Sequence, residues 1–166
     1  MRSNQAYLLL GGDKGDRLEN ISKAITRIAS LSESAPLQSD IFESDPWGFE
    51  SSLKFLNVAL IITTKLDSDR LLAELLEIER ELGRKRDANI NSYSSREMDI
   101  DIIFYNNDII DSEKLIIPHP RMYQRRFVLE PLNQIASQYI HPILNKSIKE
   151  LLEECPDKSP VTIYTK

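Results

Sequence analysis

The stretch Glu97-Met98-Asp99-Ile100-Asp101-Ile102-Ile103-Phe104-Tyr105 decides the fold of this chain. Successive side chains of an extended chain point to opposite sides, so residues two apart share a face. The apolar face is formed by Met98, Ile100, Ile102 and Phe104. Asp99, Asp101 and Ile103 share the other face, which is therefore largely acidic. The alternation predicts a strand over residues 97–105 that packs one face on a core and presents carboxylates on the other.

Three more strands are expected upstream of this one. Tyr7 to Leu10 is a short apolar run that Gly11-Gly12 closes, which is typical of a strand ending in a loop. Leu37–Ser44 predicts a second strand before a Pro-Trp-Gly loop, and Phe55–Thr64, rich in β-branched and apolar residues, predicts a long third strand.

Two helices are expected between these strands. Asp16 with Glu19 resembles a capping box and predicts a helix start. The apolar stripe of this helix is Leu18, Ile21, Ile25 and Ile28. Asp67 or Ser68 begins the second helix, which ends at Gly83. Its stripe is Leu71, Leu75, Ile78 and Leu82.

The order strand, helix, strand, strand, helix, strand is the split βαβ arrangement of a ferredoxin-like α+β sandwich. Both helices then cover the same sheet face, and the other face is left free for ligands. A C-terminal hairpin around Asn106-Asn107-Asp108 and a loop through Pro118-His119-Pro120 follow, then short helices near Pro131–Ser137 and Lys146–Glu153. We expect one domain over residues 1–166.

The composition restricts the classes of partner. The 166 residues are 41% apolar and 28% charged, with a net charge of −5, which argues against general affinity for nucleic acid or anionic membranes. No apolar run approaches a membrane span, and the N-terminus lacks the pattern of a signal peptide, so we expect a cytoplasmic protein. The single cysteine, Cys155, is expected to be structural.

Asp99 and Asp101 are the sharpest local sign of chemistry. Their Cα atoms would lie about 6.6 Å apart on one strand face, so the two carboxylates could share hard cations. Magnesium typically takes one or two carboxylates together with substrate phosphates, and paired metal ions lie about 3.5–4 Å apart. A solvated strand face is the alternative for an Asp-x-Asp pair, and these two residues by themselves do not decide between the two interpretations.

Basic residues flank the acidic strand. Arg84-Lys85-Arg86 and Arg96 border a loop from Arg84 to Ser95 that has no apolar period. Arginine suits phosphate through its planar fork of donors, and enzymes that use ATP depend on such charges. A solvated charge run is the alternative, which we favour for Lys85.

Phe55 and Asn57 alternate with the apolar residues of the third strand and so share the face of the Asp pair. An aromatic face with a side-chain amide can hold a flat heterocycle, although both residues could also be structural. Gly11-Gly12-Asp13-Lys14-Gly15 lacks the Gly-Lys-Ser/Thr ending of a Walker loop, so we reject that fold.

Taken together, these pieces resemble the 6-hydroxymethyl-7,8-dihydropterin pyrophosphokinase family of folate biosynthesis, from about Tyr7 to Pro142. The stretches that carry the resemblance are Phe55-Leu56-Asn57-Val58-Ala59, Glu79 to Arg84, Arg96 to Asp101, and Pro118-His119-Pro120-Arg121-Met122 continuing through Arg125, Arg126, Phe127, Val128, Leu129, Pro131 and Leu132.

The resemblance implies an enzyme that transfers the β,γ-pyrophosphate of ATP to the pterin hydroxymethyl group and releases AMP. It assigns two magnesium ions to Asp99 and Asp101, and catalytic roles to Arg84 and Arg96. It assigns the pterin to Asn57, Phe127, Phe55 and Tyr93. It assigns ATP to His119, Arg125, Glu79 and Lys114. We expect a monomer that binds ATP and the pterin.

This chain departs from the family pattern at three places. Its first loop reads Gly11-Gly12-Asp13-Lys14-Gly15 where the family usually has Gly-Ser-Asn-Leu-Gly, Tyr93 replaces a common Trp, and Lys114 stands where an Arg is often found. Two other readings use the same strand: another magnesium-dependent nucleotidyl or phosphoryl transferase, and a regulatory module that binds a small ligand without catalysis.

Replacing Arg96 by Ala is expected to slow turnover while ligand binding stays nearly normal, because the resemblance assigns Arg96 to charge that develops during transfer. Steady-state kinetics and equilibrium binding of the pterin test this, with Lys85→Ala as the matched control for loss of a solvated cation. A large loss of pterin affinity in Arg96→Ala would place Arg96 in substrate binding instead.

Overall fold

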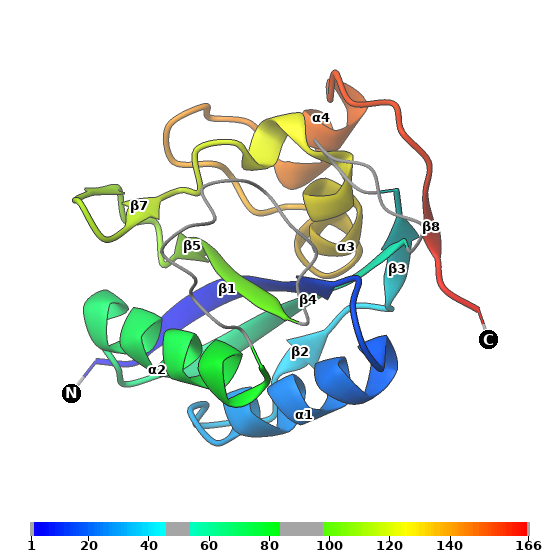
Figure 1. Cartoon of the computed structure of the whole chain (residues 1–166). Coiled ribbons are helices and arrows are strands. Elements are labelled where there is room, and N and C mark those ends of the chain that lie inside the picture. The colour runs from blue at the N-terminus through cyan, green and yellow to red at the C-terminus, as the bar shows by residue number, and fades with distance from the viewer. Residues whose placement is uncertain (1, 46–53, 84–97, 166) are drawn as a thin grey trace.

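The computed structural model describes residues 2–45, 54–83 and 98–165 of the chain. The elements follow the expected order (Figure 1). They are β1 (Asn4–Gly12), α1 (Arg17–Ala29), β2 (Leu37–Gln38), β3 (Phe42–Ser44), β4 (Phe55–Thr64), α2 (Ser68–Glu81), β5 (Asp99–Tyr105), β6 (Ile110–Asp111), β7 (Ile116–Ile117), η1 (Met122–Gln124), α3 (Arg126–Ala136), α4 (Ile148–Glu153) and β8 (Val161–Ile163).

One antiparallel sheet organises the molecule. Its strand order is β5-β1-β4-β3-β8, and the short β2 pairs with β4 as well. The two long central strands, β1 and β4, are paired from Asn4 with Thr64 to Gly12 with Leu56. This topology confirms the ferredoxin-like arrangement expected from the sequence, with β8 as an added strand that the sequence analysis missed.

The helices α1 and α2 cover one face of the sheet, as expected (Figure 1). Asp16 Oδ1 accepts a hydrogen bond from Glu19 N at 3.1 Å, and Asp67 Oδ1 accepts one from Arg70 N at 2.8 Å, so each helix begins at an acidic cap. Gly83 has a φ of 101°, which confirms that the chain leaves α2 through a left-handed residue.

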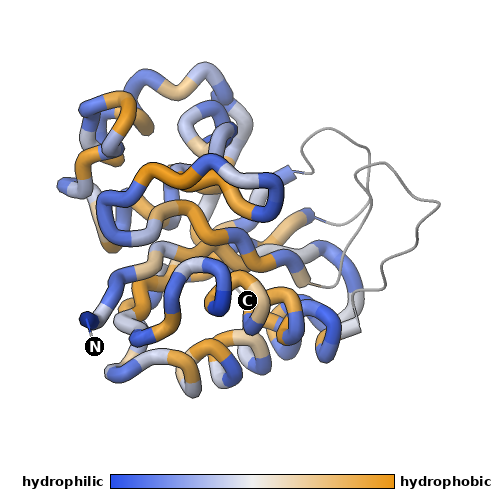
Figure 2. Tube along the Cα trace, turned by 90° about the vertical axis from the view of Figure 1, so that its left-hand side faces the viewer, coloured by the Kyte–Doolittle hydropathy of each residue, from blue (hydrophilic) through white to orange (hydrophobic). Residues whose placement is uncertain are grey.

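A first core fills the space between these helices and the sheet. It contains, among others, Ala6, Leu8 and Leu10 of β1, Leu56, Val58, Leu60 and Ile62 of β4, Ile21, Ala24 and Ile28 of α1, and Leu71, Leu75 and Ile78 of α2. Apolar segments run through the middle of the trace in Figure 2, whereas many outer turns are hydrophilic. The predicted stripes of both helices therefore face this core.

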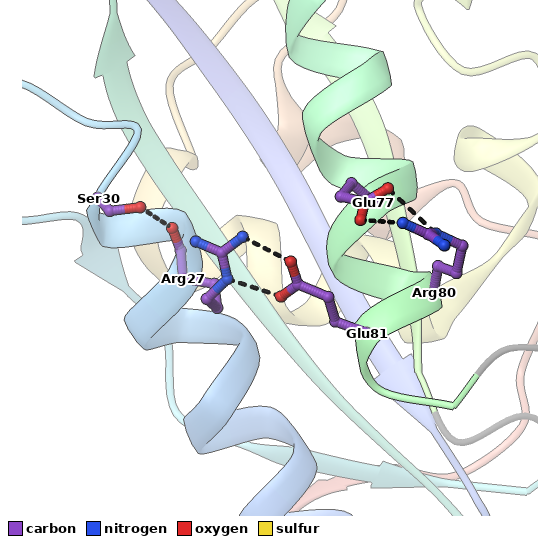
Figure 3. Close-up of polar contacts among 5 residues, drawn as sticks. All are labelled: Arg27, Ser30, Glu77, Arg80 and Glu81. Carbon is purple, nitrogen blue, oxygen red and sulfur yellow. Dashed lines mark hydrogen bonds and ion pairs between the residues drawn. The ribbon is translucent and has the colours of Figure 1, made fainter.

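Two arginines of these helices form ion pairs with glutamates (Figure 3). Arg27 near the end of α1 donates two hydrogen bonds of 2.8 Å to the Glu81 carboxylate at the end of α2. The bond and the charge of Glu81 raise the pKa of Arg27, and Arg80 pairs with Glu77 along α2. Both pairs are exposed, so they orient the helix ends rather than supply the main stability.

The expected strand Leu37–Ser44 is divided into β2 and β3. Ser39 stays attached to β4, because its N–H donates to Ala59 O at 3.0 Å and its Oγ accepts from Ala59 N at 2.9 Å. The next backbone N–H, that of Asp40, donates to the side chain of Gln134 on α3. The ladder is interrupted because Ala59 N bonds to the Ser39 side chain and Asp40 N to the Gln134 side chain, in place of backbone carbonyls.

A bulge in β5 corrects the predicted alternation of this strand. Tyr7 pairs with Phe104 and Leu8 with Ile102, so Ile103 is an extra residue between two ladder positions. The extra residue shifts the alternation by one, as bulges do. Phe104 therefore joins Ile103 on the second face of the sheet, and the prediction that it shares the face of Met98 is wrong.

A second core lies on the other face of the sheet, beneath α3 and α4 (Figure 1). It contains Tyr7, Leu9, Ala59, Ile103, Phe104, Met122, Val128, Leu129, Leu132, Ile148, Leu151 and Cys155. The prediction that this face is free for ligands is wrong where these helices cover it. The core ends at Leu9 and Ala59, and the next residues along the same face carry the polar groups described below.

The C-terminal elements differ from the predictions in their bounds. The hairpin is formed by β6 and β7 and turns at residues 112–115, whereas residues 106–108 form the turn that leaves β5. The helix expected to begin near Pro131 begins at Arg126 and contains Pro131 in its interior. The helix expected from Lys146 begins after Ser147, which forms a complete capping box with Glu150.

None of the helices in the described ranges combines the length and apolarity needed to cross a membrane.

Leu8→Ala is expected to lower the free energy of unfolding by about 2–5 kcal/mol, because it opens a cavity in the first core. Leu8 is 0% exposed on the central strand β1, and Leu37 is 53% exposed on β2. Leu37→Ala makes the same chemical change at the surface and should alter stability by no more than about 0.5 kcal/mol. Denaturant unfolding measures both, and equal losses would contradict this description of the core.

Candidate active site

The strand register places the acidic and amide side chains in one row across the sheet. Asp99 of β5 pairs with Gly11 of β1, which pairs on its other side with Asn57 of β4. Asn57 in turn pairs with Phe42 of β3. Directly paired residues of an antiparallel ladder point to the same face. Asp99 and Asn57 therefore stand on the same face with one strand between them.

The middle position of this row has no side chain. A Cβ added to Gly11 would lie 2.5 Å from Asn57 Oδ1 and 3.4 Å from Leu56 O. Asn57 is 2% exposed, and its Nδ2 donates to Ser44 Oγ at 2.9 Å. Ser44 therefore fixes the orientation of the Asn57 amide, whose oxygen lies over Gly11, the residue between Asn57 and the acidic strand β5. Glycine inside a strand commonly marks such a close approach.

The two aspartates lie on the same face of β5, opposite Gly11 and Leu9, and both are half-buried. Across the described residues, no group of three or more His, Cys, Asp or Glu side chains gathers into a complete metal cage. Asp99 and Asp101 can supply oxygen ligands to one side of a cation. This donor set fits a hard cation whose other ligands come from water or phosphate.

Glu79 holds the backbone between the two aspartates. It lies on α2 and is 2% exposed, and its Oε2 accepts a hydrogen bond of 2.7 Å from Ile100 N. Because β5 is an edge strand, this N–H is satisfied by a side chain in place of another strand. The contact fixes the strand segment that carries Asp99 and Asp101.

His119 is brought to the same site by the bulge in β5. Its N–H donates to the carbonyl of Ile103 at 3.0 Å, and its Nδ1 accepts from Arg121 N at 3.3 Å. Burial, then the positive charges of Arg125 and Arg121, lower the pKa of His119 to about 4, although Asp99 acts in the opposite direction. His119 is therefore neutral near pH 7, and it lies within electrostatic reach of Asp99 and Arg125.

Arg125 and Phe127 extend the site from the start of α3. Arg125 is 8% exposed and precedes the first residue of the helix, and its Cζ lies 5.8 Å from the centroid of the Phe127 ring. Phe127 is half-buried against the second core. A guanidinium and an aromatic ring are thus adjacent at the start of α3.

The remaining predicted residues fall into three groups. Phe55 begins β4 two residues before Asn57, so it shares the face of the row and is half-buried. Lys114 is exposed in the turn between β6 and β7, which form a sheet separate from that of the aspartates. Arg84, Tyr93 and Arg96 lie outside the described residues.

Two residues of this site were missed by the sequence analysis. Gly11 was interpreted as the end of a strand, whereas β1 continues through Gly12 and Gly11 makes room for the Asn57 amide. Two consecutive glycines after an apolar run could have indicated a close approach to the sheet. Ser44 had no signal of its own, because its role depends on the pairing of β3 with β4.

Fold and site together define a class: an α+β protein of ferredoxin-like topology with a polar, cation-compatible and arginine-bearing site on one sheet face. The sequence model of the 7,8-dihydro-6-hydroxymethylpterin-pyrophosphokinase (HPPK) family matches residues 7–137. This chain therefore belongs to that family, which confirms the resemblance.

Two relatives show how far the similarity extends. The 2-amino-4-hydroxy-6-hydroxymethyldihydropteridine pyrophosphokinase of Aquifex aeolicus is 38% identical over 148 residues, which cover 89% of this chain and 90% of that protein. The protein of the same name from Bacillus subtilis is 41% identical over 140 residues, covering 82% and 80%.

The fold is also that of solved structures. An HPPK-DHPS crystal structure from Plasmodium falciparum aligns with a TM-score of 0.72 at 16% identity. The alignment covers 92% of this chain and 43% of that longer chain, so it supports the fold of the matching part.

Gly11→Ala is expected to lower the free energy of unfolding by about 1–3 kcal/mol, because the new Cβ displaces the Asn57 amide from its bond with Ser44. The matched background is Asn57→Ala, which removes the atom that collides with the Cβ. Gly11→Ala should be clearly less harmful there in denaturant unfolding. An equal loss in both backgrounds would show that backbone strain, and not Asn57, makes glycine necessary.

Proposed function

We propose that this chain transfers the β,γ-pyrophosphate of ATP to the hydroxymethyl group of 6-hydroxymethyl-7,8-dihydropterin and releases AMP, as a step of folate biosynthesis. The observation that carries the proposal is the row Asp99, Gly11 and Asn57 in a chain of this family. It supports the proposal because a carboxylate, which we assign to the cation, and an amide, which we assign to the heterocycle, share one face with Gly11 between them.

Magnesium is the cation that suits the acidic end of the row. Asp99 and Asp101 supply hard oxygen ligands on a backbone that Glu79 fixes, and they leave coordination positions for phosphate oxygens and water. Two magnesium ions bound there would neutralise phosphate charge and orient the reacting phosphorus.

The phosphates of ATP are assigned to the basic side of the site. Arg125 is a buried cation close to His119, which is also close to Asp99, and a neutral His119 can contact a nucleotide without adding positive charge beside the magnesium ions. Arg84 and Arg96 are proposed to assist transfer, and Lys114 to contact ATP. Glu79, which the resemblance assigns to ATP, acts in our proposal chiefly by holding the strand of the aspartates.

The pterin is assigned to the amide end of the row. Asn57 offers Oδ1 on the side of Gly11, while its Nδ2 donates one hydrogen bond to Ser44 Oγ. Phe127 supplies a ring for stacking, and Phe55 lies on the same sheet face. Tyr93 is proposed as a further aromatic contact.

The reaction then consists of positioning two substrates in line. The hydroxymethyl oxygen forms a bond to the β-phosphorus of ATP, the bond between this phosphorus and the α,β-bridging oxygen breaks, and AMP leaves with that oxygen. The hydroxyl proton is released to water during the attack. Arginine side chains meet the charge that develops on the phosphate oxygens. The protein contributes orientation and charge, which are the main sources of rate in phosphate transfer.

We also propose that the chain acts as a single-domain monomer in the cytoplasm. The sheet and both cores involve elements from β1 to β8, which supports one cooperative unit over the described residues. An enzyme that consumes ATP works where ATP is available, and the only cysteine, Cys155, is buried and free.

Incubation with ATP, magnesium and 6-hydroxymethyl-7,8-dihydropterin is expected to yield AMP and the pterin diphosphate in equal amounts. Asp99→Asn and Asp101→Asn should each lower kcat by at least about 100-fold with little change in thermal stability, because the shape is kept and the cation-binding charge is lost. Asp111→Asn, at an exposed position of β6, is the matched control.

Chromatographic identification of the nucleotide product separates the alternatives. ADP would indicate an ordinary kinase, and free pyrophosphate would indicate a nucleotidyl transferase. Either product, or full activity in both aspartate variants, would contradict the proposal. Absence of turnover with retained binding of a small ligand would favour the regulatory module.

A further inference from the structure

The first turn of α3 lacks interactions that usually stabilise the start of a helix. The residue before it, Arg125, makes no side-chain capping bond. Pro131 lies inside the helix and has no N–H, so the carbonyl of Phe127, four residues earlier, receives no helical hydrogen bond from it. Two arginines, Arg125 and Arg126, also stand at the helix end that disfavours cations. Arg126 pairs with Glu130 along the helix at 3.0 Å, but no side chain of α3 itself caps this turn.

The missing cap comes from a distant part of the chain. Asp157, in the connection between α4 and β8, accepts a hydrogen bond from Arg126 N at 3.2 Å through Oδ2. Its Oδ1 accepts from the N–H of Ser159 at 2.9 Å and from the Ser159 hydroxyl. Partial burial by itself would raise the pKa of Asp157, but the bonds from Ser159 and Arg126 outweigh it and lower the pKa. The negatively charged carboxylate of Asp157 therefore lies at the N-terminal end of α3, where the helix dipole is positive.

The same connection also reaches the other side of the row. After Ser159 the chain enters β8, where Val161 pairs with Ser44, the residue that fixes the Asn57 amide. The Asp157 turn therefore lies between two supports: the start of α3, with Arg125 and Phe127, and the edge of β3. It lies outside residues 7–137, the part of the chain that matches the family model.

We infer that Asp157 is a positioning residue for substrate binding: by capping the first turn of α3 it holds Phe127, and with it Arg125, in the orientation that receives the pterin and ATP. The inference rests on the proposed function, because Phe127 and Arg125 are substrate contacts only under that proposal. It assigns to Asp157 no contact with either substrate.

The test measures pterin binding in the presence of magnesium and α,β-methylene-ATP, which cannot undergo the transfer, by isothermal titration calorimetry. Asp157→Ala should raise the Kd of 6-hydroxymethyl-7,8-dihydropterin roughly 3–30-fold, the range expected when a helix cap is lost and the binding side chain loses its orientation. Asp157→Asn keeps a capping oxygen and should restore most of the affinity. In turnover, the change should be found in KM for the pterin more than in kcat.

The matched control is Ser147→Ala, which removes the cap of α4 away from the row. It should lower the midpoint of thermal unfolding and leave the Kd of the pterin unchanged. The double variant Asp157→Ala with Phe127→Ala should bind the pterin no more weakly than Phe127→Ala, because Asp157 acts through Phe127. If Asp157→Ala does not fold, Asp157→Glu replaces it, since the longer carboxylate caps poorly while the charge is kept.

The outcomes separate the two proposals. If the unaltered protein forms AMP and binds the pterin but Asp157→Ala, or Asp157→Glu in its place, binds with unchanged Kd, Asp157 is only structural and this inference is overturned. Additive losses in the double variant overturn it as well. If the unaltered protein neither binds the pterin nor forms AMP, the proposed function itself fails, and the inference fails with it.

Discussion

A side chain at position 11 would displace the Asn57 amide, because Asn57 Oδ1 lies 2.5 Å from where its Cβ would be. This close approach is the constraint on which the site depends. Gly11 is the shared ladder partner of Asp99 and Asn57, so the empty position lies between a carboxylate and an amide. Because β1 lies between them, β5 and β4 are two interstrand spacings apart, which is roughly 9.5 Å. The sheet thereby keeps two chemically different groups apart while both face the same side.

The exposed backbone of the edge strand is used to assemble the rest of the site. β5 pairs with a strand on one side only, which leaves backbone groups that must find other partners. Ile100 N donates to Glu79 of α2, and Ile103 O accepts from His119 N. Partners that satisfy an edge strand thus also bring a helix and the His119 loop to Asp99.

Periodicity and caps predicted the elements because each of these signals is local. Asp16, Asp67 and Gly83 act at the helix ends where the sequence placed them, and β4 spans Phe55–Thr64 as expected. The bulge at Ile103 could not be predicted, since it concerns the register of two strands and not the pattern of one. The start of α3 was missed for a similar reason, because its cap is supplied by a residue distant in sequence.

The candidate site, too, could be predicted only where the signal was local. Asp99, Asp101 and Asn57 were predicted on one face from alternation, and the register places them there. The roles of Gly11, Ser44 and Ile103 depend on which residues pair across strands, and alternation within a single strand does not specify this. The closeness of His119 to both Asp99 and Arg125 follows from that pairing too, because the carbonyl of the bulge residue receives the His119 loop.

The bond between Arg126 and Asp157 also bears on how the protein is made. These residues are 31 positions apart, so a chain growing on the ribosome at about 5–20 residues per second carries Arg126 for roughly 2–6 s before Asp157 exists. The sheet residues Gly11, Asn57 and Asp99 are all synthesised earlier. The cap of the α3 turn that carries Phe127 therefore forms only after β1, β4 and β5, the strands of Gly11, Asn57 and Asp99, have been synthesised.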